Sequence, residues 1–255
     1  MAMVRGLYTA ATGMMVQRDR MDTVTNNITN ADTTGYKQDS VVTSAFTEVM
    51  LSRINDPSVN VLGGTQVGTY DYGTRVDEEY TDFSEGNYEE TDQSTDLAIS
   101  GNGFFVVDTD DGERYTKAGD FSVDSAGYLV TEDGNYVLGE NGKIHVGTSD
   151  FTVSADGTVT VGGGTVDTLR LETFDDLTVL RKQGDNLYYA YGGAASVAAT
   201  DATVKQGMLE GSNVDISNEM VDMLSLYRKY EANQKVVSMT DSSLELAANL
   251  GKLGG

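Results

Sequence analysis

Apolar side chains recur at alternating steps of four and three residues at both ends of the chain, and this spacing limits the possible folds most strongly. The N-terminal run comprises Met3, Leu7, Ala10, Met14, Gln17, Met21, Val24 and Ile28. The C-terminal run comprises Met220, Met223, Tyr227, Tyr230, Gln234, Val237, Asp241, Leu244 and Ala248. Because such a period places these side chains on one face of a helix, it predicts a long helix at each end.

Local signals predict where these helices end and begin. The short polar side chains of residues 26–32 compete for the backbone and are expected to end the first helix. Gly35 follows in a predicted turn, where it can take a positive φ. Before the second run, Asp215 or Ser217 is placed to cap the first turn. Gly13 lies inside the first helix and costs about 1 kcal/mol relative to alanine.

Between the two helices the pattern changes to β-structure. Short runs of alternating polarity are separated by glycine turns, and the turn glycines are Gly112, Gly127, Gly134, Gly142 and Gly157. This pattern is typical of an antiparallel, hairpin-rich sandwich or barrel. The expected division is therefore an N-terminal helix (1–35), an extended connector (36–70), a β-rich body (71–210) and a C-terminal helix (211–255). The expected fold class is α+β, with the N- and C-terminal helices packed together as an axial helical layer and with a central antiparallel β-rich domain.

The charge is concentrated in the middle of the chain. Residues 1–44 sum to zero and residues 211–255 to −2, so residues 45–210 hold the remaining −21 of the formal charge of −23. An acidic body of this kind repels phosphate backbones and anionic lipids, which argues against nucleic acid and membranes as partners. No apolar run approaches the roughly 18 residues of a membrane-spanning helix, so no membrane insertion is expected.

Residue types that carry chemistry are sparse, and no catalytic, cofactor or metal site is expected. With no cysteine, disulfides and thiolate chemistry are excluded. The single histidine, His145, alternates with apolar neighbours and is predicted to lie on a strand surface. Residues 108–113 superficially resemble a calcium loop, but the third acidic position comes one residue early, which favours an acidic hairpin turn. The glycines at 101–103 and 162–164 lack the remainder of a phosphate-binding motif and are interpreted as turns.

Three separated blocks carry a resemblance to a known family. The first runs from GLYTAATGM (residues 6–14) into NNITNADTTGYK (26–37), the second is DLAISGNGFFVV (96–107) followed by YTKAGDF (115–121), and the third is LEGSNVD (209–215) leading into α-helical positions 219–221 and 230–232. Together they resemble the flagellar basal-body rod family, the FlgF/FlgG subgroup of the flagellar rod and hook axial proteins. Thr34 replaces the proline usual in the family, and Thr29 replaces a common alanine.

This resemblance implies a role. It implies a structural subunit of the proximal or distal rod, and the sequence of residues 209–214 resembles the proximal type more closely. It also implies that the subunits form a tube that transmits torque and encloses an export channel. Implied partners are copies of the chain, other rod proteins, the hook protein, the surrounding bushing ring and the flagellar type III export apparatus. The implied location is the basal body, outside the cytoplasm. Neither an activity nor a cofactor is implied.

The expected assembly interface lies on the two helices and the motif that follows the first one. Its residues are Leu7, Met14, Met21, Val24, Ile28, Asn26, Asn27, Gly35, Met220, Met223, Tyr227, Tyr230, Val237 and Leu244. Burial of one seam in a lone helix does not offset the entropy of ordering its backbone, so both ends are expected to fold on assembly. The competing interpretations are a secreted β-sandwich binding module, a hydrolase of the same fold, and a hook-type axial subunit.

Overall fold

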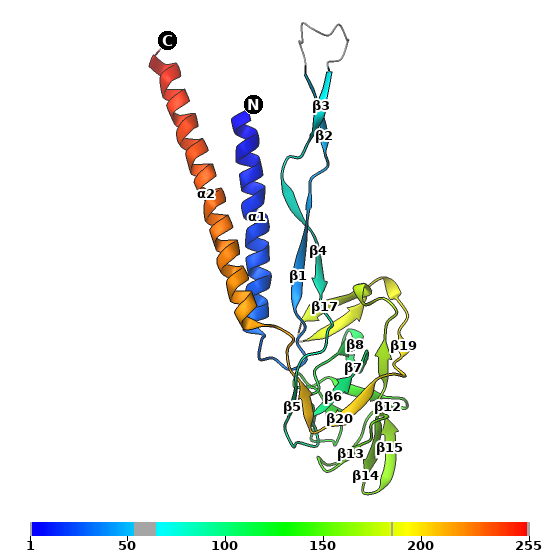
Figure 1. Cartoon of the computed structure of the whole chain (residues 1–255). Helices are drawn as coiled ribbons and strands as arrows, with labels where there is room; N and C mark the ends of the chain where they lie inside the picture. The colour runs from blue at the N-terminus through cyan, green and yellow to red at the C-terminus, as the bar shows by residue number, and fades with distance from the viewer. Residues whose placement is uncertain (1, 54–64, 185, 254–255) are drawn as a thin grey trace. The chain divides into compact units, whose positions relative to one another are not determined.

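The chain folds into two compact units, each built from separated stretches of sequence (Figure 1). The computed structural model describes residues 2–53, 65–184 and 186–253. The helix-and-ribbon unit comprises residues 1–28, 39–80 and 217–255, and the body unit comprises residues 29–38 and 81–216. The predicted division into four consecutive segments differs from these units, because residues 29–38 fold with the body and residues 39–80 with the helices. Pro57, predicted in the connector, lies outside the described residues.

Two long helices dominate the first unit. Helix α1 (Ala2–Thr29) has 28 residues and α2 (Ile216–Leu253) has 38. They pack together in antiparallel directions, with the start of α1 and the end of α2 toward the same end of the unit (Figure 1). The chain leaves α1 within the polar segment predicted to end it, and α2 begins directly after Asp215. The α+β fold with packed terminal helices is therefore confirmed.

A two-stranded ribbon accompanies the helices in this unit. Strand β1 (Asp39–Ala45) pairs with β4 (Thr74–Thr81), and β2 (Val49–Arg53) pairs antiparallel with β3 (Thr65–Tyr70). The described part of the region predicted as an extended connector is extended, but its strands β2 and β3 pair with one another, and its strand β1 pairs with β4, which was predicted in the body. Helix α1 contacts the ribbon through Tyr8, whose ring lies 6.3 Å from that of Phe46. Two-stranded ribbons are at best marginally stable alone, so this one depends on its neighbours.

The body unit is built around a 10-stranded sheet. Its main path, in spatial order, is β17 (Leu180–Gly184), β18 (Leu187–Ala190), β8 (Gly112–Thr116), β7 (Phe104–Thr109), β11 (Tyr136–Gly139), β10 (Leu129–Val130) and β9 (Ser122–Val123). Off this path, β12 (Gly142–Lys143) pairs with β11, β16 (Leu171–Thr173) with β7, and β19 (Val197–Ala198) with β16. Neighbouring strands of the path pair antiparallel, as the hairpin-rich sequence predicted.

Smaller sheets complete the body. Strands β13 (Thr152–Val153), β14 (Thr158–Val161) and β15 (Gly164–Thr168) form a three-stranded sheet, β6 (Leu97–Ser100) pairs with β20 (Thr203–Gln206), and β5 (Tyr88–Glu90) pairs with β21 (Met208–Glu210). Two short 3₁₀ helices span Leu177–Val179 and Tyr191–Gly193. The pairs β5–β21 and β6–β20 join the early and late parts of the body sequence.

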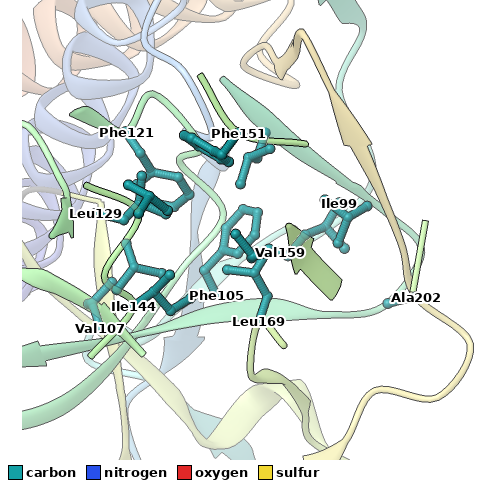
Figure 2. Close-up of a cluster of buried hydrophobic side chains, with 14 of the residues drawn as sticks. Ile99, Phe105, Val107, Phe121, Leu129, Ile144, Phe151, Val159, Leu169 and Ala202 are labelled. Carbon is teal, nitrogen blue, oxygen red and sulfur yellow. The ribbon is translucent and has the colours of Figure 1, made fainter. Parts of the chain in front are cut away.

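Strand β7 divides the body core into two clusters. Alternate side chains of a strand point to opposite faces of the sheet. Phe105 and Val107 enter the larger cluster (Figure 2), where the Phe105 ring lies edge-on to that of Phe121 at 5.0 Å. Phe104 and Val106 enter the second cluster. Since both faces of β7 are covered, the body buries its apolar side chains without help from other chains.

Candidate assembly interface

The predicted seam of α1 lies within the helix-and-ribbon unit. Leu7, Met14, Met21, Val24 and Ile28 are all half-buried. Each therefore contributes to packing inside the unit and retains some accessible surface. The same side chains serve an internal contact and leave part of their area for a further neighbour.

Sequence periodicity missed other buried positions of α1. Ala10, which belongs to the seam, is buried, but so are Thr12 and Val16, which do not. A Cβ added at Gly73 of the ribbon would lie 2.2 Å from the hydroxyl oxygen of Thr12, which shows how closely the two pack. Since α1 meets both α2 and the ribbon, more than one of its faces is covered, and a single-seam pattern describes only part of its burial.

The face of α2 turned inward differs partly from the predicted seam. The less exposed side chains again follow steps of four and three: Glu219, Met223, Leu226, Tyr230, Asn233, Val237 and Thr240. The predicted positions Met223, Tyr230 and Val237 belong to this row. Two adjacent rows with the same period share every second residue, so periodicity alone did not distinguish Leu226 and Asn233 from their neighbours one position later.

Of the other predicted residues of α2, Met220 and Tyr227 lie outside this row, whereas Leu244 continues it four positions after Thr240. Met220 is 54% exposed, Tyr227 53% and Leu244 38%. Met220 and Tyr227 adjoin further exposed apolar side chains that the seam did not include, namely Val221, Leu224, Val236, Met239 and Leu246. We call Met220, Tyr227 and these five side chains the outer stripe of α2. A large apolar face left uncovered on a helix marks an interaction surface.

Two basic residues interrupt the outer stripe near its start. A shallow groove of about 510 Å³ is lined there by Val221, Leu224, Ser225, Arg228, Lys229 and Ala232. Basic side chains are scarce in this chain, which has 17 lysines and arginines against 40 acidic residues. The groove therefore combines apolar surface with positive charge, which suits a partner surface of the opposite sign.

Gly13 marks a close approach of the two helices. A Cβ added there would lie 2.9 Å from Nδ2 of Asn233. The sequence treated Gly13 only as a loss of helix propensity, and the structure supplies the reason for it. The absent side chain leaves room for the amide of Asn233 against α1.

The end of α1 is tied to the first strand of the ribbon. Asn27, which is 1% exposed, donates from Nδ2 to the Asp39 carbonyl at 2.8 Å, and its Oδ1 accepts from the Asp39 backbone N–H at 3.0 Å. Asn26, predicted alongside it, is exposed. The two asparagines thus differ, since Asn27 orders the chain and Asn26 presents its side chain to the surface.

Gly35 lies in the body unit, at a position that has no room for a side chain. Its φ of 66° falls in the left-handed region, and a Cβ there would lie 2.3 Å from the backbone nitrogen of Ala118. Its N–H donates to the carbonyl of Glu210 at 2.7 Å. The turn predicted at Gly35 is confirmed, and it is a place where the chain segment after α1 docks onto the body.

The groups singled out for chemistry do not converge. His145 is exposed, as its alternation predicted, and its Nε2 lies 3.0 Å from the Ala126 carbonyl. The acidic segment 108–113 forms the β7–β8 hairpin turn, with Thr109 opposite Gly112. Within residues 2–53, 65–184 and 186–253, no group of three or more histidine or acidic side chains is placed to hold a metal ion. None of the described helices is both long and apolar enough to cross a membrane.

These observations define a class of protein. The body covers its own core, whereas both terminal helices carry apolar surface beyond what their mutual packing uses. A chain of this design is a structural subunit that completes its burial against other chains.

Comparison with known proteins identifies the family. Three family descriptions match in order along the chain: "Flagella basal body rod protein" over residues 7–37, "Flagellar hook protein FlgE/F/G D1 domain" over residues 98–161, and "Flagellar basal body rod FlgEFG protein C-terminal" over residues 205–250. The first covers most of α1 and the Gly35 turn, and the third covers β21 and most of α2.

Whole-length relatives agree with these matches. The chain is 35% identical to the flagellar hook-basal body complex protein FlhO of Bacillus subtilis, over 98% of this chain and 100% of the relative. It is 33% identical to the flagellar basal-body rod protein FlgG of the same organism, over 97% and 99%. It is 35% identical to the flagellar basal-body rod protein FlgF of Caulobacter vibrioides, over 98% and 100%. The chain belongs to the family of flagellar basal-body rod and hook proteins.

Proposed function

We propose that this protein acts by assembly alone, with its terminal helices forming the wall of a tube together with copies of itself and related axial proteins. It is a structural subunit of the flagellar basal-body rod. The observation that carries the assembly proposal is the outer stripe of α2. This stripe remains exposed although the adjoining face of the same helix packs inside the unit.

Burial of the outer stripe contributes to the driving force for assembly. Fully burying one large apolar side chain contributes about 1.5–3 kcal/mol. Leu224, Val221 and Met239 are each more than 60% exposed, so they retain most of that contribution for contacts between chains. Contacts that do not close on themselves then propagate along a helical tube.

The finer features of the role are part of the same proposal. The interface includes the half-buried seam of α1 and the outer stripe of α2, and both helices reach full order only within the tube. The subunit works without catalysis, transmits torque and surrounds an export channel. It leaves the cytoplasm through the flagellar type III export apparatus, resides in the periplasmic part of the basal body, and meets other rod proteins, the hook protein and the bushing ring.

The acidic body has a proposed role of its own in this assembly. Like charges on the bodies of neighbouring tubes repel each other, which opposes sideways association. Charge-neutralising substitutions within residues 70–205 are expected to increase lateral aggregation and to leave elongation intact. Impaired elongation without aggregation is the opposite result and contradicts this role.

Deleting residues 1–30 tests the assembly proposal. The truncated chain is expected to lose incorporation into the flagellum while hydrogen exchange shows the body strands still protected. Val166→Ala is a control on the body, because Val166 is an exposed apolar residue of that unit, and it is expected to leave assembly unchanged. A truncated chain that still supports a functional flagellum contradicts the proposal that the terminal helices form the wall of the tube.

A further inference from the structure

The chain crosses between its two units four times, after residues 28, 38, 80 and 216. On the body side, these crossings lie on three segments: residues 29–38, 81–87 and 210–216. The three segments are far apart in the sequence but meet around the polar side chains of Lys37, Glu210 and Asn213. We call these three residues the root cluster, and all of it lies within the body unit.

Lys37 and Glu210 form the buried centre of the root cluster. Both side chains are 0% exposed, and Nζ of Lys37 lies 2.6 Å from Oε1 of Glu210. The same Nζ donates to the carbonyl of Ser84 at 2.7 Å, and the same Oε1 accepts from the N–H of Gly86 at 3.1 Å. One ion pair therefore joins all three segments.

Asn213 joins the same three segments a second time. Its Oδ1 accepts from the N–H of Gln38 at 2.8 Å, and its Nδ2 donates to the carbonyl of Asp82 at 2.9 Å. The N–H of Asp82 in turn donates to the carbonyl of Gln38 at 2.8 Å. The residues next to the crossings are thus joined by individual hydrogen bonds between the three segments.

Backbone packing around the cluster is equally close. A Cβ added at Gly86 would lie 2.0 Å from the carbonyl oxygen of Gly211, so these two segments touch through their backbones. The N–H of Gly211 donates to the carbonyl of Asn87 at 2.8 Å. Glycine at residue 86 is what permits this approach.

Burying the charges of the cluster costs desolvation free energy, which the ion pair offsets only in part. Lys117, 3% exposed, adds a second cation 3.8 Å from Oε2 of Glu210, and burial lowers its pKa although the Glu210 carboxylate raises it. Buried ion pairs are often no more stabilising than apolar side chains of similar size, whereas they restrict geometry. The body already has two apolar clusters for its stability. The distinctive contribution of this ion pair is to fix the positions of the segments that it joins.

We propose that Lys37, Glu210 and Asn213 are positioning residues that hold the roots of the two terminal helices at a set separation in the free subunit. The inference rests on the proposed function in assembly. The roots are residues 29–38, which continue from α1, and residues 210–216, which lead into α2. A preset separation removes one source of disorder before a neighbouring subunit binds, even while the helices are incompletely folded.

The absence of cysteine makes the separation directly measurable. Asp32→Cys and Ile216→Cys place one spin label on each root, because both side chains are exposed. Double electron–electron resonance on the dilute, full-length chain then reports the distance distribution between the labels. The parent chain is expected to give one narrow peak. A broad distribution in the folded parent overturns the proposal.

The decisive variant is Lys37→Met with Glu210→Leu, made together so that neither of these two charges is left buried without the other. Lys117 loses its carboxylate neighbour but has a further hydrogen bond to the carbonyl of Gly101 at 3.0 Å. The distribution is expected to broaden by about twofold or more, since released tethers restore backbone freedom. The unfolding temperature of the body is expected to stay within a few degrees, and assembly is expected to fall. Lys143→Met with Asp108→Leu is the matched control, because it removes a surface ion pair of 3.1 Å in the same unit and leaves the peak unchanged.

A second variant keeps the test valid if the double variant unfolds. Asn213→Ala removes only neutral hydrogen bonds at a half-buried position. An unchanged distance peak in folded Asn213→Ala overturns the proposal, as does an unchanged peak in the folded double variant. Assembly by a chain lacking residues 1–30 instead refutes the proposed function, and it leaves the distance measurement on the free subunit unaffected.

Discussion

In the body unit, Phe105, Leu129 and Val137 are 0% exposed, whereas in the helix-and-ribbon unit Val221 and Leu224 are more than 60% exposed. Among the described residues, Ala10, Val16 and Leu226 are the buried apolar side chains of the helix-and-ribbon unit, and the body holds the others. One chain therefore combines a unit that is complete alone with a unit that requires neighbours.

The difference follows from how many faces of each element are covered. Strand β7 has a sheet neighbour on each side and an apolar cluster on each face. Helix α2 has one helical neighbour, and its outer stripe has none within the described chain. Since apolar burial is the main favourable term in folding, the body should be stable in the free subunit and the helices should gain most of their stability on assembly.

The largest effect is expected in the body core. Phe105→Ala removes a ring from a closely packed cluster and should lower the free energy of unfolding of the body by about 3–5 kcal/mol. Chemical denaturation of the full-length chain measures this change. Met239→Ala, a similar truncation on the outer stripe, should alter it by no more than about 0.5 kcal/mol. Equal losses from both changes would contradict the division between the two units.

The next effect should appear only in the polymer. Leu224→Ala removes an exposed side chain, so the unfolding temperature of the body should not change. If this position is buried between subunits, the lost burial should raise the critical concentration for assembly roughly 10- to 100-fold. Sedimentation of assembled material over a range of protein concentrations measures it. An unchanged critical concentration would remove Leu224 from the interface.

A pair of glycine substitutions sharpens the comparison within α1. Gly6→Ala meets no atom within 4 Å and should stabilise the helix by up to about 1 kcal/mol. Gly13→Ala makes the same chemical change but has to displace the amide of Asn233, so its gain should be smaller or reversed. Thermal melting of assembled material by circular dichroism compares the two. Equal gains would show that the contact between Gly13 and Asn233 does not constrain the helices.

The smallest effect concerns a carboxyl group of the body. Burial raises the pKa of Asp120, and the nearby Glu132 and Asp96 raise it further. A carboxyl whose pKa is higher in the folded than in the unfolded chain contributes stability at low pH that is lost as the pH rises through the folded pKa. Asp120→Asn should therefore raise the unfolding temperature at pH 7, by less than about 4 °C.

The pH dependence and a second carboxyl group both check the direction of the expected change in unfolding temperature. The gain from Asp120→Asn should shrink as the pH is lowered through the folded pKa, because the native carboxyl is then protonated. Asp156 is the opposite case, since hydrogen bonds from Thr158 lower its pKa. Asp156→Asn should therefore give no gain at pH 7, and a gain as large as that of Asp120→Asn would contradict the electrostatic explanation.

Much of the packing of the two helices was predictable from periodicity, and the limits of that prediction have a physical cause. The four-and-three spacing identified both helices and placed Leu7, Met14 and Met21 in a half-buried row. It did not find Leu226 or Asn233, because adjacent rows of a helix share the same period and differ only in which neighbour covers them. The glycine turns likewise identified the β-rich body but not which strands pair.

The sequence by itself determined the elements: two amphipathic helices, a hairpin-rich acidic body and a glycine turn after α1, since these depend on side-chain spacing and local backbone preference. Tertiary structure alone decided that residues 29–38 fold with the body and that Lys37 meets Glu210, 173 positions away. Contacts at that separation depend on chain topology, which no local pattern records. Tertiary structure also decided which face of α2 stays exposed, because the exposure of a helix face depends on which elements pack against it.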